Sequence, residues 1–240
     1  MSAATSETGE KEKIFRRIRE ALTVPAPHPG DHGGGGHETG VPVAPAHEIA
    51  HWLPLVGDGF EAQAELFARN STQLKSTFHL LPDEAAAVQT LGEIARAEAW
   101  QRVAAHGDGE AGAATHKIVN SLNLPAVWTD AGYDVREMER CDAGISECDA
   151  LVAQTGSVLV TSRSAGGRAL SVLPPHHVVL ARRAQLLADL PAAFALLERK
   201  YGAQYPSFIG LITGPSRTGD IERILVLGAH GPKKLTILCW

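Results

Sequence analysis

Five nearly unbroken apolar runs in the second half of the chain do most to limit what it can fold into. Each run is rich in Val, Ile and Leu and is bounded by turn residues, which is the pattern of strands covered on both faces. The runs span residues 157–161, 177–181, 208–213, 224–227 and 235–240. Between the second and third runs, residues 186–201 carry an apolar helical face, with Pro191 in the first turn. This alternation predicts an α/β domain with a mixed, mostly parallel sheet covered by helices.

The first half of this domain continues the alternation of helix and strand. Apolar residues recur at helical spacing over residues 58–70, and a short strand is expected over residues 76–80. Pro82 and the acidic residues after it suit the first turn of a long alanine-rich helix, which we expect to run to about Ala105.

The middle and the end of the domain give three further expectations. A strand is expected over residues 117–119, after a glycine-bearing loop. The apolar stretch at residues 142–145 introduces a small helix over residues 148–154. The strands within residues 224–240 lie close enough in sequence to form a hairpin around His230, Gly231 and Pro232.

Composition divides the chain into three parts, which are residues 1–24, 25–46 and 47–240. Residues 11–22 form an amphipathic helix that needs a partner surface, with Ile14, Phe15, Ile18 and Leu22 on its apolar face. Residues 25–46 contain six Gly and five Pro in 22 residues, so they form a flexible linker. The helix on this tether either binds a partner or a second copy of the chain, or packs back on its own domain.

The histidines in and after the linker raise the question of a metal site. They are His28, His32, His37, His47 and His51. No carboxylate or cysteine is arranged to complete a fixed coordination shell, and a flexible chain loses entropy on binding, so we expect no metal.

Cysteine content and charge exclude several classes of protein. Cys141, Cys148 and Cys239 lack CxxC spacing, so we expect reduced, buried thiols and no iron–sulfur cluster in this chain. A formal charge of -5 argues against nucleic acid as a partner. The N-terminus lacks the apolar segment of a secretory signal, and no apolar run is long enough to span a bilayer, so the expected location is the cytoplasm.

A first candidate binding loop lies at the two ends of the predicted strand 157–161. Thr155, Gly156 and Ser157 enter the strand, and a TSRSAGGR segment bearing Arg163 and Arg168 leaves it. Glycine lets backbone N–H groups turn inward, and hydroxyls or arginine then complete a site for a carboxylate or phosphate. A tight β-turn explains the same glycines without a ligand.

A second candidate loop follows the run 208–213. Gly214, Ser216, Arg217 and Thr218 lie where loops beyond strand ends gather ligands in α/β sheets. The segment is neither a P-loop nor a GxGxxG fingerprint. Asp220 either caps the next segment, pairs with Arg217 in a ligand-free brace, or acts as a general acid or base.

A third candidate loop holds His230 and Gly231. His230 is a candidate general acid or base, although a lone histidine is more often a hydrogen-bonded structural residue. Ser157 is not in a GxSxG elbow, so the sequence does not predict a hydrolase. We expect the three loops to meet at one rim of the sheet and to bind a small anion there.

The motifs QTGSVLVTS, LPPHHVVLARR and ITGPSRTGDIERILVLGAHGP together resemble the lactate utilisation protein C family, the LutC/YkgG group of LUD-domain proteins. The similarity covers residues 60–240 and is strongest over the last ninety or so residues. Two positions depart from the family pattern. Gly219 stands where alanine is expected, and Gln154 stands where glutamate is expected before the TG pair.

The resemblance implies a fold similar to the sugar-isomerase and CoA-transferase-like superfamily, which includes the formyltetrahydrofolate cyclo-ligases. It also implies a role in a bacterial three-protein system that oxidises L-lactate to pyruvate, in which partner proteins hold the iron–sulfur clusters. On this reading the chain is a non-redox subunit with an anion-binding cleft and an unidentified ligand. The alternative is a stand-alone enzyme, cyclo-ligase- or isomerase-like, that acts on a phosphorylated or carboxylated metabolite.

Overall fold

The computed structural model describes residues 54–109, 112–202, 204–218, 226–228 and 230–240, together with Lys13, Arg16, Arg17, Arg19 and Glu20. The chain divides into two compact units, residues 1–46 and 47–240. The five described residues of the first unit are helical, and Arg16 lies 4.0 Å from Glu20 across one helical turn. The predicted apolar face of that helix, the linker and its histidines lie outside the described residues.

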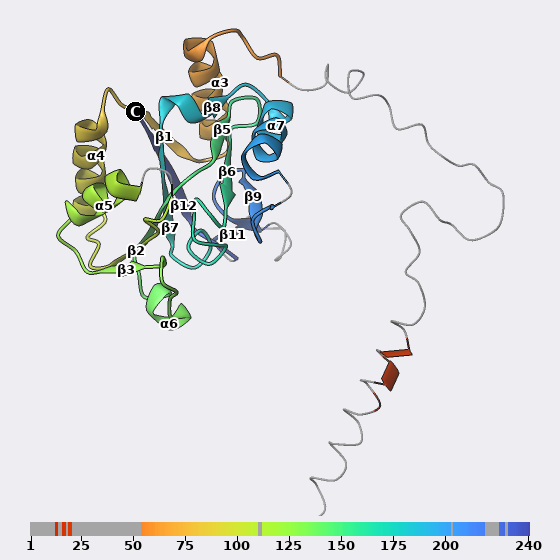
Figure 1. Cartoon of the computed structure of the whole chain (residues 1–240). Coiled ribbons are helices and arrows are strands. Elements are labelled where there is room, and N and C mark those ends of the chain that lie inside the picture. Colours follow the sequence, from red (N-terminus) through yellow and green to blue (C-terminus); the bar gives the residue numbers. More distant parts are fainter. Residues whose placement is uncertain are drawn as a thin grey trace, which may run out of the picture. The chain divides into compact units, whose positions relative to one another are not determined.

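The larger unit contains a six-stranded parallel sheet in the order β1-β12-β7-β4-β2-β3 (Figure 1). Its strands are β1 (Thr77–Leu80), β2 (Val103–Ala105), β3 (Ala126–Trp128), β4 (Ala143–Glu147), β7 (His176–Ala181) and β12 (Lys234–Cys239). Every pairing in this sheet is parallel, so the antiparallel part of the predicted mixed, mostly parallel arrangement lies outside it.

A second sheet of four strands has the order β8-β5-β6-β9. Its strands are β5 (Ala150–Val152), β6 (Ser157–Thr161), β8 (Leu186–Leu187) and β9 (Ile209–Ile212). β6 pairs antiparallel with both β5 and β9, whereas β8 pairs parallel with β5. The sheets are therefore mixed overall. A separate antiparallel pair is formed by β10 (Arg217–Thr218) and β11 (Val226–Leu227).

Helices and sheets alternate in layers (Figure 1). The helices are α3 (Phe60–Gln73), α4 (Glu84–Ala97), α5 (Gly112–Asn120), α6 (Val135–Met138) and α7 (Leu190–Tyr201). α4 and α5 pack on one face of the six-stranded sheet. α3 and the inner face of the second sheet cover its other face, and α7 covers the outer face of the second sheet.

Local sequence explains where the helices begin. Asp83 caps α4 by accepting a hydrogen bond from the backbone N–H of Ala86, and Asp189 caps α7 through Ala192 in the same way. Pro191 lies in the first turn of α7, as predicted, where its missing N–H costs nothing. Strands β6 and β7 are buried along their whole length, which confirms the prediction that their two faces are covered.

Three of the predicted elements are wrong. The alanine-rich helix ends at Ala97, because Ala99 adopts a left-handed φ of 54° and the chain then turns into β2. The predicted strand at 117–119 belongs to α5, where Ile118 and Val119 face the sheet. The predicted helix at 148–154 is instead strand β5, which pairs with β6.

The predicted hairpin around His230 is also wrong. β12 lies between β1 and β7 and is parallel to both, so it joins the centre of the main sheet. β11 pairs with β10 instead. The apolar run at the end of the chain therefore forms a central parallel strand. Periodicity alone cannot distinguish such a strand from one arm of a hairpin.

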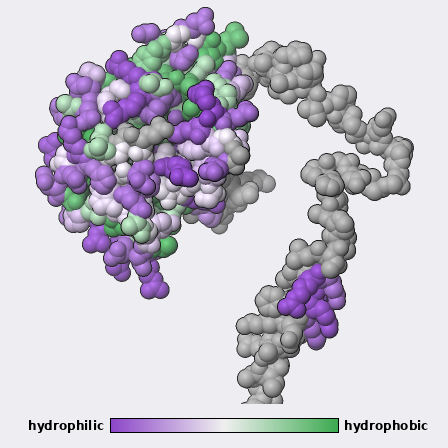
Figure 2. All heavy atoms as spheres, in the orientation of Figure 1, coloured by the Kyte–Doolittle hydropathy of each residue, from purple (hydrophilic) through white to green (hydrophobic). Residues whose placement is uncertain are grey.

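The face of the larger unit seen in Figure 2 is largely hydrophilic, with a hydrophobic patch near the top of the view. None of the helices that the structure describes is both long enough and apolar enough to cross a membrane.

Phe67 and Phe194 offer a matched test of where the core lies. Phe67 of α3 is fully buried and meets Phe78 edge-on at a centroid distance of 4.9 Å, whereas Phe194 of α7 is 60% exposed. We expect Phe67→Ala to lower the free energy of unfolding by about 3–5 kcal/mol. Phe194→Ala is expected to change it by at most ~0.5 kcal/mol. Urea denaturation measures both, and similar losses in the two variants would contradict the assigned core.

Candidate functional site

The connections of the main sheet create a crevice between the carboxyl ends of β2 and β4. From β2 the chain passes through α5 to β3 on one side, whereas from β4 it passes through the second sheet to β7 on the other side. Neighbouring strands whose connections leave in opposite directions form a topological switch point, where open α/β sheets bind ligands. The order of the strands thus selects one place in the fold for a ligand.

A cavity of about 370 Å³ lies at this switch point. Its walls come from four separate segments, namely the loop after β2, the end of β4, the loop after β6 and the end of α7. The lining residues are Asp108, Gly109, Glu147, Cys148, Arg163, Ser164, Lys200, Tyr201 and Gln204. We call this cavity the switch-point pocket.

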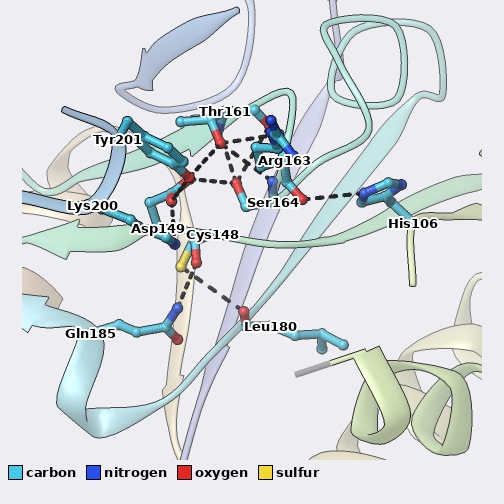
Figure 3. Close-up of polar contacts among 10 residues, drawn as sticks. All are labelled: His106, Cys148, Asp149, Thr161, Arg163, Ser164, Leu180, Gln185, Lys200 and Tyr201. Atoms are coloured by element: carbon cyan, nitrogen blue, oxygen red, sulfur yellow. Dashed lines mark hydrogen bonds and ion pairs between the residues drawn. The ribbon is translucent and has the colours of Figure 1, made fainter. Parts of the chain in front are cut away.

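The buried carboxylate of Asp149 joins these segments (Figure 3). Its Oδ1 accepts hydrogen bonds from Lys200 Nζ at 2.7 Å and from Tyr201 Oη at 2.5 Å. Its Oδ2 accepts one from Ser164 Oγ at 2.7 Å. Three donors from α7 and the loop after β6 therefore converge on one acid between β4 and β5.

This network also sets the protonation of its members. Burial alone would raise the pKa of Asp149, but the hydrogen bonds from Lys200, Tyr201 and Ser164 outweigh burial and hold that pKa below its ordinary value. Burial raises the pKa of Tyr201, and its hydrogen bond to the Asp149 carboxylate raises it further. The floor of the pocket therefore holds an ionised acid beside a neutral phenol at neutral pH.

Glu147, the last residue of β4, is a second buried acid in the pocket. Thr115 of α5 donates a hydrogen bond to its Oε1 at 2.6 Å. A Cβ on Gly109 would lie 2.6 Å from its Oε2, so only glycine fits at that position while the carboxylate keeps its place.

The loop after β2 is fixed by Asp130, which follows β3. Its Oδ1 accepts hydrogen bonds from the backbone N–H groups of Gly107 and Asp108 at 2.8 and 3.0 Å. The same oxygen lies 3.0 Å from Nδ1 of the buried His106. The Nε2 of His106 lies 3.3 Å from the carbonyl oxygen of Arg163, so the loops after β2 and β6 are joined (Figure 3).

Arg163 supplies a cation at the pocket. It is exposed, and its backbone N–H donates to Thr161 Oγ1. Its guanidinium has no hydrogen-bond or ion-pair partner among the residues that the structure describes. The neighbouring ammonium of Lys200 is paired with Asp149. Arg163 is therefore the group best placed to bind an anion entering the pocket.

The first two predicted loops lie close to each other. Ser157 Oγ is 2.8 Å from Thr213 Oγ1 across the β6–β9 pair. Gly156 and Gly214 both adopt positive φ and pack against the end of α3, at Asn70–Ser71 and at Leu74 respectively. The hydroxyl of Thr155 is buried without a partner among the described residues.

The second and third predicted loops also meet. The backbone N–H of Ser216 donates to the carbonyl of Pro232 at 2.9 Å, and a Cβ on Gly231 would lie 3.1 Å from Ser216 Cβ. Arg217 and His230 are exposed. Thr218 lies in β10, but its side chain is not among the described parts of the structure. Asp220 is not among the described residues.

The Thr155–Ser157 loop, which meets the second predicted loop, lies at the opposite end of β6 from the switch-point pocket. Ser157 begins this strand beside the predicted loops, and Thr161 ends it beside the pocket. At about 3.3 Å per residue the two sites lie roughly 13 Å apart along the strand. Arg163 and Ser164 of the predicted TSRSAGGR segment line the pocket. The pocket is not lined by the other predicted binding residues, which are Thr155, Gly156, Ser157, Gly214, Ser216, Arg217, Thr218 and Gly231.

Sequence reasoning missed the floor of the pocket, although two signals were present. The TSRSAGGR segment is a predicted anion-binding candidate, and its Arg163 and Ser164 do line the pocket. The sequence predicts a helix up to Ala105, whereas residues 103–105 form β2, so the glycine-bearing loop follows a parallel strand. Asp149 lay in a segment predicted to be helical, and its partners Ser164 and Lys200 are distant in sequence.

The fold and the crevice define an α/β protein with a cavity at the carboxyl edge of a parallel sheet. A family model described as the LUD domain matches residues 64–239. The chain therefore belongs to the LUD domain family, which confirms the family resemblance predicted from its motifs.

Several curated relatives share one name, lactate utilization protein C. The protein of that name from Anoxybacillus flavithermus is 28% identical over 184 residues, which is 72% of this chain and 78% of the relative. The protein from Shouchella clausii is 34% identical over 106 residues, which is 44% of this chain. The protein from Geobacillus thermodenitrificans is 35% identical over 112 residues, which is 45% of this chain. The matched regions span 46% and 47% of these two relatives, or about half their length.

A solved structure of a DUF162 family protein from Deinococcus radiodurans has a similar fold. The TM-score is 0.57 at 15% sequence identity, and the match covers 76% of this chain and 99% of that chain. Identity this low supports the fold alone. The predicted α/β class is confirmed, and the finer similarity to the sugar-isomerase and CoA-transferase-like superfamily stays a prediction.

Replacing Asp149 tests the network at the pocket floor. Because its pKa is lowered in the folded state, the ionised carboxylate stabilises the protein above its unfolded-state pKa, and this stabilisation is lost as the pH falls through the folded-state value. We expect Asp149→Asn to cost about 3–5 kcal/mol at pH 7, because Lys200 loses its buried partner.

The difference in the free energy of unfolding between wild type and Asp149→Asn should become smaller as the pH falls below about 4. Urea denaturation at several pH values measures it. Asp134→Asn is the matched control, because asparagine caps a helix about as well as aspartate. A gap between wild type and Asp149→Asn that stays constant down to pH 2 would contradict the assigned role.

The three cysteines are buried and unpaired, as predicted. Burial raises the pKa values of Cys141 and Cys239 to about 11 and raises that of Cys148 well above its ordinary value. Since the thiolate is the reactive form, we expect iodoacetamide at pH 8 to leave all three unmodified in the folded protein and to modify all three in urea. Mass spectrometry reads the result, and fast labelling of any thiol in the folded protein would contradict it.

Proposed function

We propose that this chain is a component of a bacterial lactate utilisation system that oxidises L-lactate to pyruvate. On this proposal it is a non-redox subunit whose switch-point pocket binds an organic anion. Membership of the LUD domain family and the shared name of its relatives support a role in lactate utilisation.

The state of the cysteines supports the non-redox role. An iron–sulfur cluster needs several thiolates that converge on one site. Here the pKa of each thiol is raised by burial, so each resists the deprotonation that ligation requires. We propose that iron–sulfur partner proteins carry out the electron transfer, and that the system works in the cytoplasm.

The observation that carries the anion-binding role is the unpaired guanidinium of Arg163 at a cavity on the topological switch point. Guanidinium groups bind carboxylates and phosphates through two parallel hydrogen bonds. The other cation of the pocket, Lys200, already neutralises Asp149. An incoming anion would therefore compensate a charge that the described residues leave unpaired.

A second candidate function rests on the three predicted loops. Gln154 Oε1 and Thr155 Oγ1 are buried without partners among the described residues, and such groups normally hold a water or a ligand. In this alternative the chain is a stand-alone enzyme acting on a phosphorylated or carboxylated metabolite. Gly156, Ser157, Gly214, Ser216, Arg217, Thr218 and Gly231 would bind the ligand, and His230 or Asp220 would move a proton.

We propose that the N-terminal segment 11–22 is a docking helix, for a partner protein or for a second copy of the chain; the alternative stays that it packs back on its own domain. Size-exclusion chromatography of the full chain, alone and with its iron–sulfur partners, addresses this role.

Growth on lactate tests the proposed function in the organism that encodes the chain. Deletion of its gene should abolish growth on L-lactate and leave growth on pyruvate unchanged, because only the step between the two is lost. Normal growth of the deletion strain on L-lactate would contradict the proposed role.

Two arginine variants, reintroduced into the deletion strain, then locate the site. Arg163→Gln should restore growth poorly, since its anion contact is lost, whereas Arg217→Gln should restore it fully. The opposite result would place the ligand at the three predicted loops. Immunoblotting confirms equal amounts of the two variants.

A further inference from the structure

We propose that the chain has a second anion site, at the amino edge of the main sheet, where Lys75 and Lys233 bind the phosphate group of a small metabolite. The proposal goes beyond the function given above, because this site shares no lining residue with the switch-point pocket and lies at the other edge of the sheet. It follows from the charges that line a second cavity and from the way its two unpaired lysines are held.

The cavity lies where β1, β7 and β12 begin, and its volume is about 300 Å³. The first residues of these three strands, Thr77, His176 and Lys234, all line it. Helix α4 contributes Ile94 and its C-cap residue Glu98 to another wall. Open α/β sheets bind ligands at the carboxyl ends of their strands, so the switch point does not account for this cavity. We call it the amino-edge cavity.

Positive charge exceeds negative charge in the amino-edge cavity. Three of its lining residues are lysines, Lys75, Lys233 and Lys234, and one is an acid, Glu98. Glu98 accepts a hydrogen bond from Lys234 Nζ at 2.8 Å and so compensates that lysine. The ammonium groups of the other two have no partner among the residues that the structure describes. Because the whole chain has a formal charge of -5, this excess does not reflect a generally basic protein.

The two histidines of the cavity add no charge to it. Burial lowers the pKa of both His79 and His176, so both rings are neutral at neutral pH. The buried ring of His176 lies 2.9 Å from Glu98 Oε2 through Nδ1 and 2.8 Å from Thr236 Oγ1 through Nε2. Glu98 is thus held by His176 and Lys234 together, and it is not available to the two unpaired lysines.

The backbone of Lys75 is strained by its own side chain. Lys75 follows the last turn of α3 with a φ of 69°, a left-handed conformation that favours glycine because a Cβ is crowded there. No hydrogen bond or ion pair of its exposed ammonium with the described residues offsets this strain. An anion bound by the ammonium would supply the missing interaction.

Lys233 is held in place through its backbone and through its stem. Its backbone N–H donates a hydrogen bond to the carbonyl oxygen of Pro175 at 2.7 Å, beside the start of β7. A Cβ on Gly228 would collide with Cγ of Lys233, so the backbone of Gly228, at a φ of 77°, lies directly against the lysine stem. The first glycine of the LGAHGP motif therefore positions a cation of the amino-edge cavity.

Two unpaired ammonium groups on one cavity favour a ligand with more than one negative charge. A phosphate monoester carries about 1.5 to 2 negative charges at pH 7, whereas a simple carboxylate carries one. Lysine binds phosphate as a point charge, and the exposed hydroxyl of Thr77 is a further donor at the same cavity. A volume of 300 Å³ equals that of about ten water molecules at roughly 30 Å³ each. The cavity therefore admits a phosphate together with part of the metabolite that bears it.

Acetylation of lysines by N-hydroxysuccinimidyl acetate tests the proposal on the wild-type full chain, with glycerol 3-phosphate as the probe. Mass spectrometry measures the rate at each lysine. At ten times the Kd of the probe, labelling of Lys75 and Lys233 should be about tenfold slower, because only the ligand-free site reacts. Lys117, which is exposed and pairs with Glu84 away from the cavity, should keep its rate. L-Lactate at the same concentration should protect neither cavity lysine.

Variants show that the two lysines act on one ligand. Lys233→Gln should raise by about tenfold or more the probe concentration that half-protects Lys75, since a hydrogen bond to a charged group contributes about that factor. Lys117→Gln is the matched control and should leave that concentration unchanged. Arg163→Gln should also leave it unchanged, because Arg163 lines the other pocket. Circular dichroism confirms that each variant is folded.

Four results would overturn the proposal. They are unchanged labelling of Lys75 and Lys233 in the presence of glycerol 3-phosphate, equal protection by L-lactate, loss of protection in Arg163→Gln, and better protection by a hexaglutamate peptide, which would assign the surface to an acidic protein partner. The comparison of probes uses the wild-type chain, so it decides the matter even if a variant does not fold.

Discussion

The hydrogen bonds to the buried carboxylate of Asp149 are the interactions on which the switch-point pocket depends. This carboxylate lies where the chain leaves the main sheet for the second sheet, and it accepts hydrogen bonds from the loop after β6 and from the end of α7. Apolar packing holds the layers together, but it has no direction and does not fix which loop meets which helix. The three polar contacts to one acid fix this arrangement, so they place the walls of the pocket.

The fold and this network together explain why a cavity lies at this place. The strand order opens a crevice between β2 and β4, and His106 and Asp130 hold the loop on one side of it. The Asp149 network fixes the other side and occupies Lys200, which leaves Arg163 as the available cation.

Much of the fold could be predicted from sequence, because its strands are continuous apolar runs bounded by turns. Strand β6 and the helix α7 with its first-turn proline illustrate this. Pairing could not be predicted, since the run at Lys234–Cys239 fits a hairpin arm or a central parallel strand equally well. The pocket floor was missed for a related reason. The role of Asp149 depends on its contacts with Ser164 and Tyr201, which lie 15 and 52 residues away in sequence. Local sequence patterns do not predict such contacts.

Titration calorimetry of the full chain with small organic carboxylates and phosphates, in the wild type, Arg163→Gln and Arg217→Gln, tests the central claim most directly. The account predicts that Arg163→Gln weakens binding of the tightest anion by about tenfold or more and that Arg217→Gln leaves its affinity unchanged. Unchanged affinity in Arg163→Gln together with weaker binding in Arg217→Gln would contradict it.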